Sequence, residues 1–598
     1  MIEKSDIEKF NKLGIKSIYE LTLIAPSRID DYTITNSLRL NNKHLYQVKI
    51  KNFYHTSKVL FVYTILTTSQ EALQLTVFKP KPFHLRQFNQ GQTLYIYGEV
   101  GVNSQGGYEI THPQVLNQVG GLVAKYNTPL RNDSFERLKN RYIKEENLSD
   151  LPPKVIYSLM QLHYPTVADN IFKGKNLEPQ ILYALKFTEL YHYYSSLKKK
   201  KQYFKAINSF KNIDIYNWTK SLPFDLTSAQ KSVIDDVKND LSKDNSARRM
   251  IIGDVGSGKT MIMLSVVQMV FPSKVVLMAP TTLLANQLYE EAEKFLDKSI
   301  NKVLVTNKTK KIDLSMFDFI IGTHALLYRE LPKIDVIMID EQHRFGTNQR
   351  AMLEKILFQG SKRPHFFQFS ATPIPRTQAM IDSALIDVSL ITQTPFKKDI
   401  ITTIISKVEF NSLLEHIKKE IQQNHQVLIV YPLVEQSQAI NYQSLEEASS
   451  YWKTHFEDVY VTHGKDKNKE DVLLNFRDNG KILLATTVVE VGISLPRLST
   501  VVIVGAERLG LSTLHQLRGR VSRTGLKGWC YLFTKSTNKL RLESFSKIDN
   551  GFDIAILDLK YRKSGDLLVG KQQSGQEFKW VDLSQDEKII HDVQEYIK

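Results

Sequence analysis

One loop of the chain has the residue types and spacing to hold a triphosphate. GDVGSGKT, residues 253–260, follows the apolar run RMII and precedes the helical pattern MIMLSVVQMVF. This is the G-x-x-x-x-G-K-[ST] pattern in the strand-to-helix context that it requires. Glycines let backbone N–H groups close around phosphate oxygens, and the start of the following helix favours negative charge. We expect Lys259 to reach the β and γ phosphates and Thr260 to ligate Mg²⁺. The residues expected to contact the nucleotide in this loop are Gly253, Gly256, Ser257, Gly258, Lys259 and Thr260.

A second stretch, VIMIDEQHRFG at residues 336–346, places two acids at the end of an apolar strand. In a P-loop fold, an acid at this place completes the Mg²⁺ shell, and Asp340 fits that position. Glu341 can orient or deprotonate the attacking water, and His343 could sense the γ-phosphate. An acidic pair at a strand end is usually ordinary solvent-facing sequence. Its combination with the phosphate loop favours a catalytic role.

A third stretch, QLRGRVSRTG at residues 516–525, places Arg520 and Arg523 on a helical turn. Guanidinium groups that arrive from the far side of a cleft can stabilise the charge that develops on a γ-phosphate. Taken alone, the segment would be a solvated basic helix. With the other two stretches it predicts hydrolysis coupled to the closure of two domains.

The helices and strands that position these residues can be predicted from the pattern of apolar residues after residue 216. Continuous apolar runs alternate with helical stretches, which predicts two parallel sheets covered on both faces and separated near residues 390–410. Upstream, five short alternating runs between residues 46 and 115 predict a small barrel of the OB type, with a generic small β domain as the open alternative. Helical patterns flank the barrel. These patterns divide the chain into an N-terminal helical segment (1–40), a barrel domain (41–120), a helical linker (121–215), a first sheet domain that carries the phosphate loop (216–400), a second sheet domain (401–540) and a C-terminal region (541–598).

Composition limits the class of protein. The 598 residues exceed a single hydrophobic core. No apolar stretch approaches the roughly 18 residues of a membrane span, and the opening MIEKSDIEKF lacks the apolar core of a signal peptide. A single cysteine, Cys530, excludes internal disulfides and fits a cytoplasmic protein. The net charge of +16 favours a polyanionic partner, nucleic acid ahead of anionic lipid.

These motifs resemble those of superfamily 2 helicases. The phosphate loop, DEQH, Ser370–Thr372 and residues 516–523 look like motifs I, II, III and VI. LTSAQ, which ends at Gln230, resembles the segment that reads adenine. The residues that resemble the DNA-contacting motifs Ia and Ib are Thr281, Thr282, Gln287, Thr323 and His324.

More narrowly, DEQHRFGTNQR, SATPIPRT, TTVVEVGISLP and GAERLGLSTLHQLRGRVSR are similar to the RecG family of bacterial branched-DNA helicases. This resemblance covers nearly the whole chain. It implies that residues 41–120 form an OB-fold wedge domain, that residues 216–400 and 401–540 form two RecA-like domains with ATP bound by the first, and that residues 541–598 form the translocation hairpin region. It implies a monomeric, ATP-driven and Mg²⁺-dependent duplex translocase that remodels forks, Holliday junctions and D-loops in recombination and repair. A cytoplasmic, nucleoid-associated location and a contact with a single-strand-binding protein are further expectations. Gly551–Gly575 looks like the family's translocation hairpin, with Arg562 and Gln573 as expected DNA-coupling residues.

The predicted barrel also carries a candidate wedge. Phe78 and Phe83 flank Pro80 and Pro82, a stiff turn from which aromatic rings could project. Stacking on the last base pair could offset on the order of 1–3 kcal/mol of the melting cost. Either phenylalanine could instead belong to the core.

Several positions depart from the RecG pattern. Ser494 stands where the family usually has Asp near the nucleotide ribose, and Lys563 and Gln572 alter the hairpin. Three alternatives remain open: an RNA helicase, a transcription-repair coupling translocase, and a passive junction-binding protein with a dead ATP site. Intact Lys259, Asp340, Glu341, Arg520 and Arg523 oppose the last of these.

Overall fold

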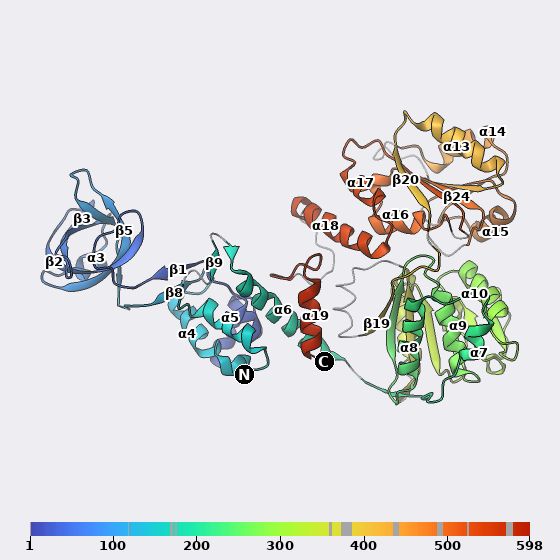
Figure 1. Cartoon of the computed structure of the whole chain (residues 1–598), viewed down its shortest axis with the longest axis horizontal. Helices are drawn as coiled ribbons and strands as arrows, with labels where there is room; N and C mark the ends of the chain where they lie inside the picture. The colour runs from blue at the N-terminus through green and yellow to red at the C-terminus, as the bar shows by residue number, and fades with distance from the viewer. Residues whose placement is uncertain are drawn as a thin grey trace. The chain divides into compact units, whose positions relative to one another are not determined.

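The computed structural model divides the chain into two compact units. Unit 1 holds Met1–Ser196, Glu577–Asp582 and Lys588–Lys598, and unit 2 holds Leu197–Gln576 and Leu583–Glu587 (Figure 1). The structure describes residues 2–117, 119–167, 171–173, 176–201, 203–357, 361–371, 386–396, 398–434, 442–486, 494–522, 525–569 and 578–597.

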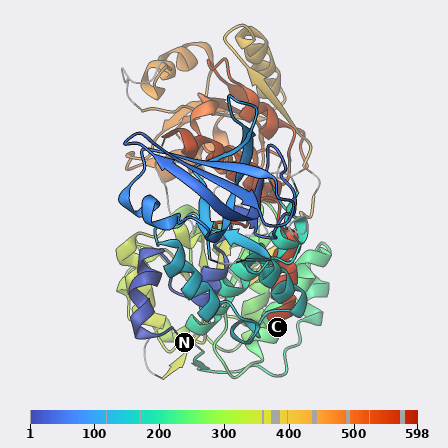
Figure 2. The same cartoon turned by 90° about the vertical axis from the view of Figure 1, so that its left-hand side faces the viewer.

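A closed barrel forms the first part of unit 1, and Figure 2 shows its strands in blue. The neighbour order is β2-β3-β4-β6-β5-β7, and an added pairing of β2 with β5 closes the sheet. Alternate side chains point inward to a core that includes Val48, Val62 and Leu75. The predicted OB-type barrel is therefore confirmed. Its strands are β2 (Lys43–His55), β3 (Val59–Leu66), β4 (Ala72–Phe78), β5 (Thr93–Val102), β6 (Tyr108–Thr111) and β7 (Gln114–Leu116).

Helices of unit 1 pack around a separate core that includes Phe10, Leu21 and Phe135. Two strands here lie in segments that the sequence predicted as helical. β1 (Arg28–Asp31) pairs antiparallel with β8 (Leu122–Lys125), so the chain segments before and after the barrel satisfy each other's backbone groups. The remaining elements are α1 (Ile7–Lys12), α2 (Ile18–Thr22), α3 (Pro82–Gln87), α4 (Asn132–Tyr142), α5 (Pro153–His163), β9 (Phe172–Lys173), β10 (Asn176–Leu177) and α6 (Pro179–Lys200).

The C-terminal residues also belong to unit 1. The Glu189 carboxylate on α6 accepts hydrogen bonds from the backbone N–H groups of Lys579, Trp580 and Val581, at 2.6, 2.9 and 3.0 Å. The indole Nε1 of Trp580 donates to the Leu23 carbonyl at 3.0 Å. These contacts precede α19 (Glu587–Ile597) and attach the end of the chain to α6.

Unit 2 contains two parallel sheets, as predicted. The first has the order β14-β15-β13-β16-β18-β12-β19. Alternate residues of each central strand enter cores on opposite faces: Val336 and Met338 on one face, Ile337 and Ile339 on the other. The strands are β12 (Arg248–Gly253), β13 (Val275–Met278), β14 (Lys302–Val305), β15 (Phe319–Gly322), β16 (Val336–Asp340), β18 (His365–Ser370) and β19 (Asp387–Ile391).

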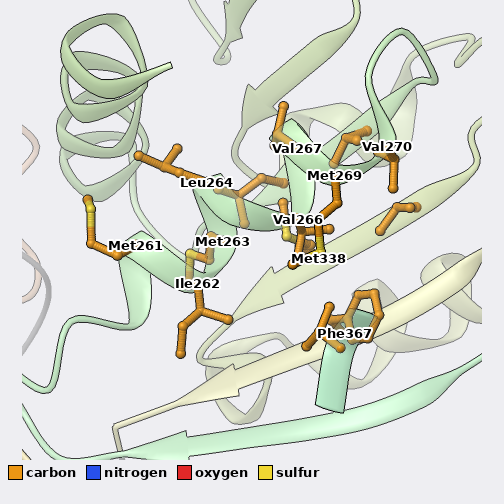
Figure 3. Close-up of a cluster of buried hydrophobic side chains, with 14 of the residues drawn as sticks. Met261, Ile262, Met263, Leu264, Val266, Val267, Met269, Val270, Met338 and Phe367 are labelled. Carbon is orange, nitrogen blue, oxygen red and sulfur yellow. The ribbon is translucent and has the colours of Figure 1, made fainter. Parts of the chain in front are cut away.

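Helix α9 (Lys259–Val270) is buried almost entirely against this sheet. Figure 3 shows its apolar side chains, from Met261 to Val270, beside Met338 of β16 and Phe367 of β18. Because this helix starts at the phosphate loop, its packing fixes the loop relative to the sheet. The other elements of this region are α7 (Tyr216–Ser221), α8 (Ser228–Leu241), α10 (Thr282–Phe295), α11 (Thr347–Leu357), β11 (Lys205–Ala206) and β17 (Lys362–Arg363).

The second sheet has the order β20-β25-β24-β21-β23-β22 and is also parallel throughout. Its strands are β20 (Ile400–Ile405), β21 (Gln426–Val430), β22 (Val459–Thr462), β23 (Ile482–Ala485), β24 (Leu498–Val504) and β25 (Gly528–Phe533). Its helices are α13 (Phe410–Gln422), α14 (Leu445–His455), α15 (Lys469–Asn479), α16 (Leu511–Arg518), α17 (Leu540–Ser546) and α18 (Gly551–Val569).

Helix α18 begins the predicted hairpin region and packs on α16. The side chains of Arg562 and Lys563 in this helix lie outside the described residues. Residues 570–577, which include Gln572 and Gln573, also lie outside them. The coupling roles of Arg562 and Gln573 therefore stay predictions.

Candidate active site

The carboxyl edge of the first sheet gathers the predicted phosphate-binding and acidic residues. Adjacent parallel strands β12, β18 and β16 end at Gly253, Ser370 and Asp340, and the strand register places Ile252 opposite Ser370 and Asp340 opposite Phe369. Parallel strands bring their carboxyl ends to one edge, where ligands of such sheets bind. The three motifs therefore meet because of the strand order.

In the phosphate loop, glycine is required at two positions. Gly256 and Gly258 have φ of 79° and 81°, in the left-handed region that side chains disfavour. A Cβ added to Gly258 would collide with Nε2 of Gln230. The Lys259 ammonium donates to the carbonyls of Gly253 and Asp254, at 2.7 and 3.1 Å. The loop carbonyls thus hold the side chain of Lys259, which is the first residue of α9.

The side chain of Gln230 joins this loop to the start of α8. Its Oε1 accepts from the Thr227 N–H at 2.8 Å, which completes a capping box at the start of α8. Its Nε2 donates to the Ser257 carbonyl at 2.9 Å, and the side chain is buried. Both ends of the amide are therefore engaged within the fold, and the predicted contact of Gln230 with adenine stays a prediction.

Asp340 is buried, whereas its neighbour Glu341 is half-buried and lines the pocket edge. Burial raises the pKa of the Asp340 carboxyl, and the neighbouring Glu341 carboxylate raises it further, against the opposing charge of Lys259. Within the described part of the chain, Oδ1 of Asp340 is buried and has no hydrogen-bond partner. A buried carboxylate oxygen of this kind fits a cation as its missing partner.

Glu341 is held by the strand next to it. Its φ of 50° is unusual for a residue with a side chain, and such strain is found at functional sites. The Ala371 N–H donates to its Oε1 at 2.6 Å, and the Ser370 hydroxyl donates to its Oε2 at 3.3 Å. Ser370 and Ala371, predicted as part of motif III, therefore orient the carboxylate predicted to act on water. The side chain of His343 and the whole of Thr372 lie outside the described residues.

One pocket of about 340 Å³ joins these groups to the second sheet domain. Lys259, Thr260, Asp340 and Glu341 line it together with Arg520, as do Gln516, Ser494 and Ser522 of the same domain. This volume lies within the range of small-molecule and cofactor sites. Arg520 is buried and belongs to the same pocket as the phosphate loop, whereas Arg523 lies outside the described residues.

Sequence reasoning missed two contacts across the seam, the boundary between the first and the second sheet domain. The guanidinium of Arg344 donates to Oε1 of Gln516 at 3.3 Å, and His515 Nε2 donates to Oδ1 of Asp254 at 2.5 Å. Asp254 lies inside the phosphate loop and His515 just before the arginines of motif VI. Their place in the two motifs was the only available sign of the contact.

Among the residues predicted to touch DNA, those that resemble motifs Ia and Ib belong to the first sheet domain. Thr281 and Thr323 follow β13 and β15, and each hydroxyl caps the helical turn that starts there. His324 is half-buried. Gln287 lines the same 340 Å³ pocket and its amide donates to Glu291 at 3.4 Å. Thr282 is half-buried at the start of α10.

In the barrel, both predicted wedge rings reach solvent. Phe78 is 50% exposed and Phe83 55%, which separates them from the core. Phe83 lies in the first turn of α3 and its ring centroid is 3.8 Å from that of His84, while Phe78 lies 5.8 Å from His112. Three exposed tyrosines on the described part of the barrel, Tyr54, Tyr63 and Tyr108, were not predicted as candidates.

Both sheet domains match known protein families. Residues 223–375 match the family described as "Type III restriction enzyme, res subunit", and residues 409–525 match "Helicase conserved C-terminal domain". A protein of Helicobacter pylori strain 26695 named "ATP-dependent DNA helicase RecG" is 41% identical over 97% of the chain and 96% of its own length. The protein of the same name from Aquifex aeolicus is 31% identical over 96% of the chain and 80% of its own length.

The chain belongs to the RecG family of ATP-dependent DNA helicases.

A solved structure supports the same family. "Structure of RecG bound to three-way DNA junction" covers 98% of the chain and 84% of that chain, with a TM-score of 0.56 and 26% identity. The resemblance to RecG and the predicted helicase class are confirmed. The matches to RecG relatives extend through the barrel and C-terminal region, outside the two helicase domains, so the RNA-helicase and transcription-repair alternatives are not favoured. Within the described residues, no helix is long and apolar enough to cross a membrane.

Proposed function

We propose that the chain is an ATP-driven translocase on double-stranded DNA that remodels branched DNA, reversing stalled forks and migrating Holliday junctions. The observation that supports this proposal most directly is one pocket, which is lined by Lys259, Asp340 and Glu341 of one sheet domain and by Arg520 of the other. RecG relatives and a RecG bound to a three-way DNA junction support the choice of substrate.

In the pocket, each residue has a distinct task. Backbone N–H groups of the loop and the Lys259 ammonium bind the phosphates. Thr260 and the buried carboxylate of Asp340 would hold Mg²⁺, which would neutralise phosphate charge when bound. Glu341, fixed by the Ala371 N–H and the Ser370 hydroxyl, accepts a proton from the attacking water.

Arg520 couples this chemistry to movement. Its guanidinium belongs to the second sheet domain, so it can stabilise the charge on the γ-phosphate only while the two domains are closed. Loss of the γ-phosphate removes the negative charge that favours closure. Arg523 is assigned the same role from its place in motif VI. Alternation between the closed and open forms moves the first domain along DNA relative to the second.

DNA contacts complete the proposal. Thr281, Thr282, Thr323 and His324 contact the backbone of one strand from the carboxyl edge of the first sheet, with Gln287 beside them. Arg562 and Gln573 of the hairpin region couple the relative movement of the two sheet domains to the DNA. The exposed rings of Phe78 and Phe83 stack on the base pair at the branch point and separate the strands.

We extend the proposal to the wider setting of the chain. We assign the chain a monomeric state, a contact with a single-strand-binding protein, and a cytoplasmic, nucleoid-associated location.

A comparison of substrates tests the proposal. ATP hydrolysis and strand separation are measured on a forked DNA, a linear duplex, a single strand and a structured RNA. Forked DNA should give the fastest strand separation, and the two DNA duplexes should stimulate hydrolysis more than RNA does. Equal or greater activity on RNA would contradict the assignment to branched DNA.

A further inference from the structure

One large aromatic side chain at the nucleotide pocket has no role in the chemistry described so far. Phe396 lies in the segment that connects β19 of the first sheet to β20 of the second, and it lines the pocket together with Pro395 and Lys398. Its side chain is 61% exposed. A ring left in water beside a ligand pocket is a ready contact for an apolar surface of the ligand.

Three contacts hold the segment in place on both sides of the ring. Upstream, Oε1 of Gln393 accepts from the Ser228 hydroxyl at 2.9 Å and from the Ala229 N–H at 3.3 Å. Downstream, the Lys398 ammonium donates to the Val255 carbonyl at 2.5 Å. The segment that carries the ring is thus attached to the start of α8 upstream and to the phosphate loop downstream.

Local geometry also keeps the ring close to the loop. The Thr394 hydroxyl donates to the Phe396 carbonyl at 2.9 Å, which fixes the turn that carries the ring. A Cβ added to Gly256 would lie 3.5 Å from Cε of Lys398. The contacts of Gln393 and Lys398 are with α8 and the phosphate loop, and the contact of Thr394 lies within the segment itself. None of these contacts involves Asp340 or Glu341.

Near the start of α8, the amide of Gln230 is already engaged. Its two ends bond to Thr227 and to the loop carbonyl of Ser257, and the side chain is buried. Hydrogen bonds from this amide to a base would require breaking the capping box or the support of the loop. An exposed aromatic face nearby needs no such exchange, because stacking uses the face of the base and not its polar edge.

We propose that Phe396 is the stacking platform for the purine base of the bound nucleotide, and so a residue that determines affinity for ATP. This assignment rests on the proposed nucleotide site. Loss of a base–aromatic stack weakens binding by roughly tenfold. Since the base does not react, the loss should fall on KM and leave the turnover number unchanged.

The test measures DNA-stimulated ATP hydrolysis by the full-length chain and its Phe396→Ala variant. The KM for ATP should rise about tenfold, with kcat within about twofold of the wild-type value. Inorganic tripolyphosphate, a competitor with phosphates and no base, should inhibit both proteins with the same inhibition constant. Phe396→Trp should restore KM, and its indole fluorescence should be quenched by ADP.

Matched controls separate this assignment from the site itself. Met316→Ala removes a side chain that is 72% exposed and lies outside the pocket, and it should leave KM unchanged. An unchanged KM in Phe396→Ala, or equal weakening of ATP and tripolyphosphate, would overturn the stacking role. If Lys259→Ala kept full hydrolysis, the nucleotide site itself would be misplaced. If Lys259→Ala is inactive but Phe396→Ala keeps the wild-type KM for ATP, the nucleotide site stands and only the stacking role of Phe396 is overturned.

Discussion

His515 on α16 and Asp254 in the phosphate loop form a hydrogen bond of 2.5 Å across the seam between the two sheet domains. The other oxygen of the carboxylate accepts from the Gly551 N–H at the start of α18, at 3.2 Å. Arg518, three residues after His515, donates to the Ile548 carbonyl at 2.6 Å, shortly before that helix. Asp254 therefore ties the phosphate loop to α16 and to the base of α18 in one network.

This network predicts a pH-dependent contribution to stability. Burial alone would raise the pKa of Asp254, but the hydrogen bond and charge of His515 outweigh it, and the pKa lies below its usual range. A lowered folded-state pKa stabilises the protein above the unfolded value of about 3.9, and this stabilisation is lost as the pH falls towards the folded value. Asp254→Asn should lower the free energy of unfolding by about 2 kcal/mol at pH 7. Denaturant titrations should show this difference shrinking below about pH 4; a difference independent of pH would contradict the charged contact.

Removal of the phosphate lysine or the acid that orients water should abolish hydrolysis and spare DNA binding. We expect Lys259→Ala and Glu341→Gln to lose DNA-stimulated ATPase, because the first removes a phosphate contact and the second removes the proton acceptor. Binding to a labelled junction, measured by anisotropy without nucleotide, should be nearly unchanged. Hydrolysis at the wild-type rate in either variant would refute the site assignment.

The aromatic rings of Phe78 and Phe83 on the barrel should affect the rate of strand separation and not the rate of ATP hydrolysis. Replacement of Phe78 and Phe83 by Ala removes stacking on the order of 1–3 kcal/mol per base. Fork processing, followed by the release of a labelled strand, should slow by about tenfold or more. The ATPase rate on the same fork should fall much less. Tyr157→Ala, which removes a ring that is 63% exposed on α5 of the same unit, is the control and should leave both rates unchanged. Equal losses in both assays of the double variant would argue against a wedge.

Attachment of the segment around Trp580 to α6 uses one carboxylate, that of Glu189. Glu189→Ala removes the acceptor of three backbone N–H groups, so we expect the segment around Trp580 to detach at a cost of about 2 kcal/mol. Limited proteolysis should then cleave after Lys579 faster than in the wild-type protein. Glu189→Gln, which keeps an acceptor oxygen, should show a smaller effect. Equal protection of all three proteins would mean that other contacts hold the segment.

Much of the fold follows from the sequence because burial on both faces gives central parallel strands continuous apolar runs. β13 and β16, with VVLM and VIMID, are of this kind and were predicted. The strands β14, β19, β20 and β25 were not. Three of these lie at the edges of their sheets, and β20 reads IITTII with exposed and half-buried residues in alternation over most of its length. A half-exposed strand of this kind has a weaker apolar signature.

Within the site, motif spacing predicted the phosphate loop and the acidic pair because each lies in one continuous stretch. Contacts between distant stretches could not be predicted, since nothing local in the sequence joins Asp254 to His515 or Glu189 to Trp580. Gln230 illustrates a missed local pattern. Thr227 and Gln230 have the spacing of a capping box, and that pattern indicated a structural role for the amide beside the expected base contact.

The central claim is that hydrolysis takes place in the seam between the two sheets and requires Arg520. Its most direct test is the rate of ATP hydrolysis by Arg520→Ala at saturating ATP and forked DNA, beside the affinities of the variant for ADP and for the fork. We predict a rate about a thousandfold below that of the wild-type protein, with both affinities within a few fold, because the guanidinium acts on charge that develops only in the transition state. Hydrolysis within a few fold of the wild-type rate would contradict the claim.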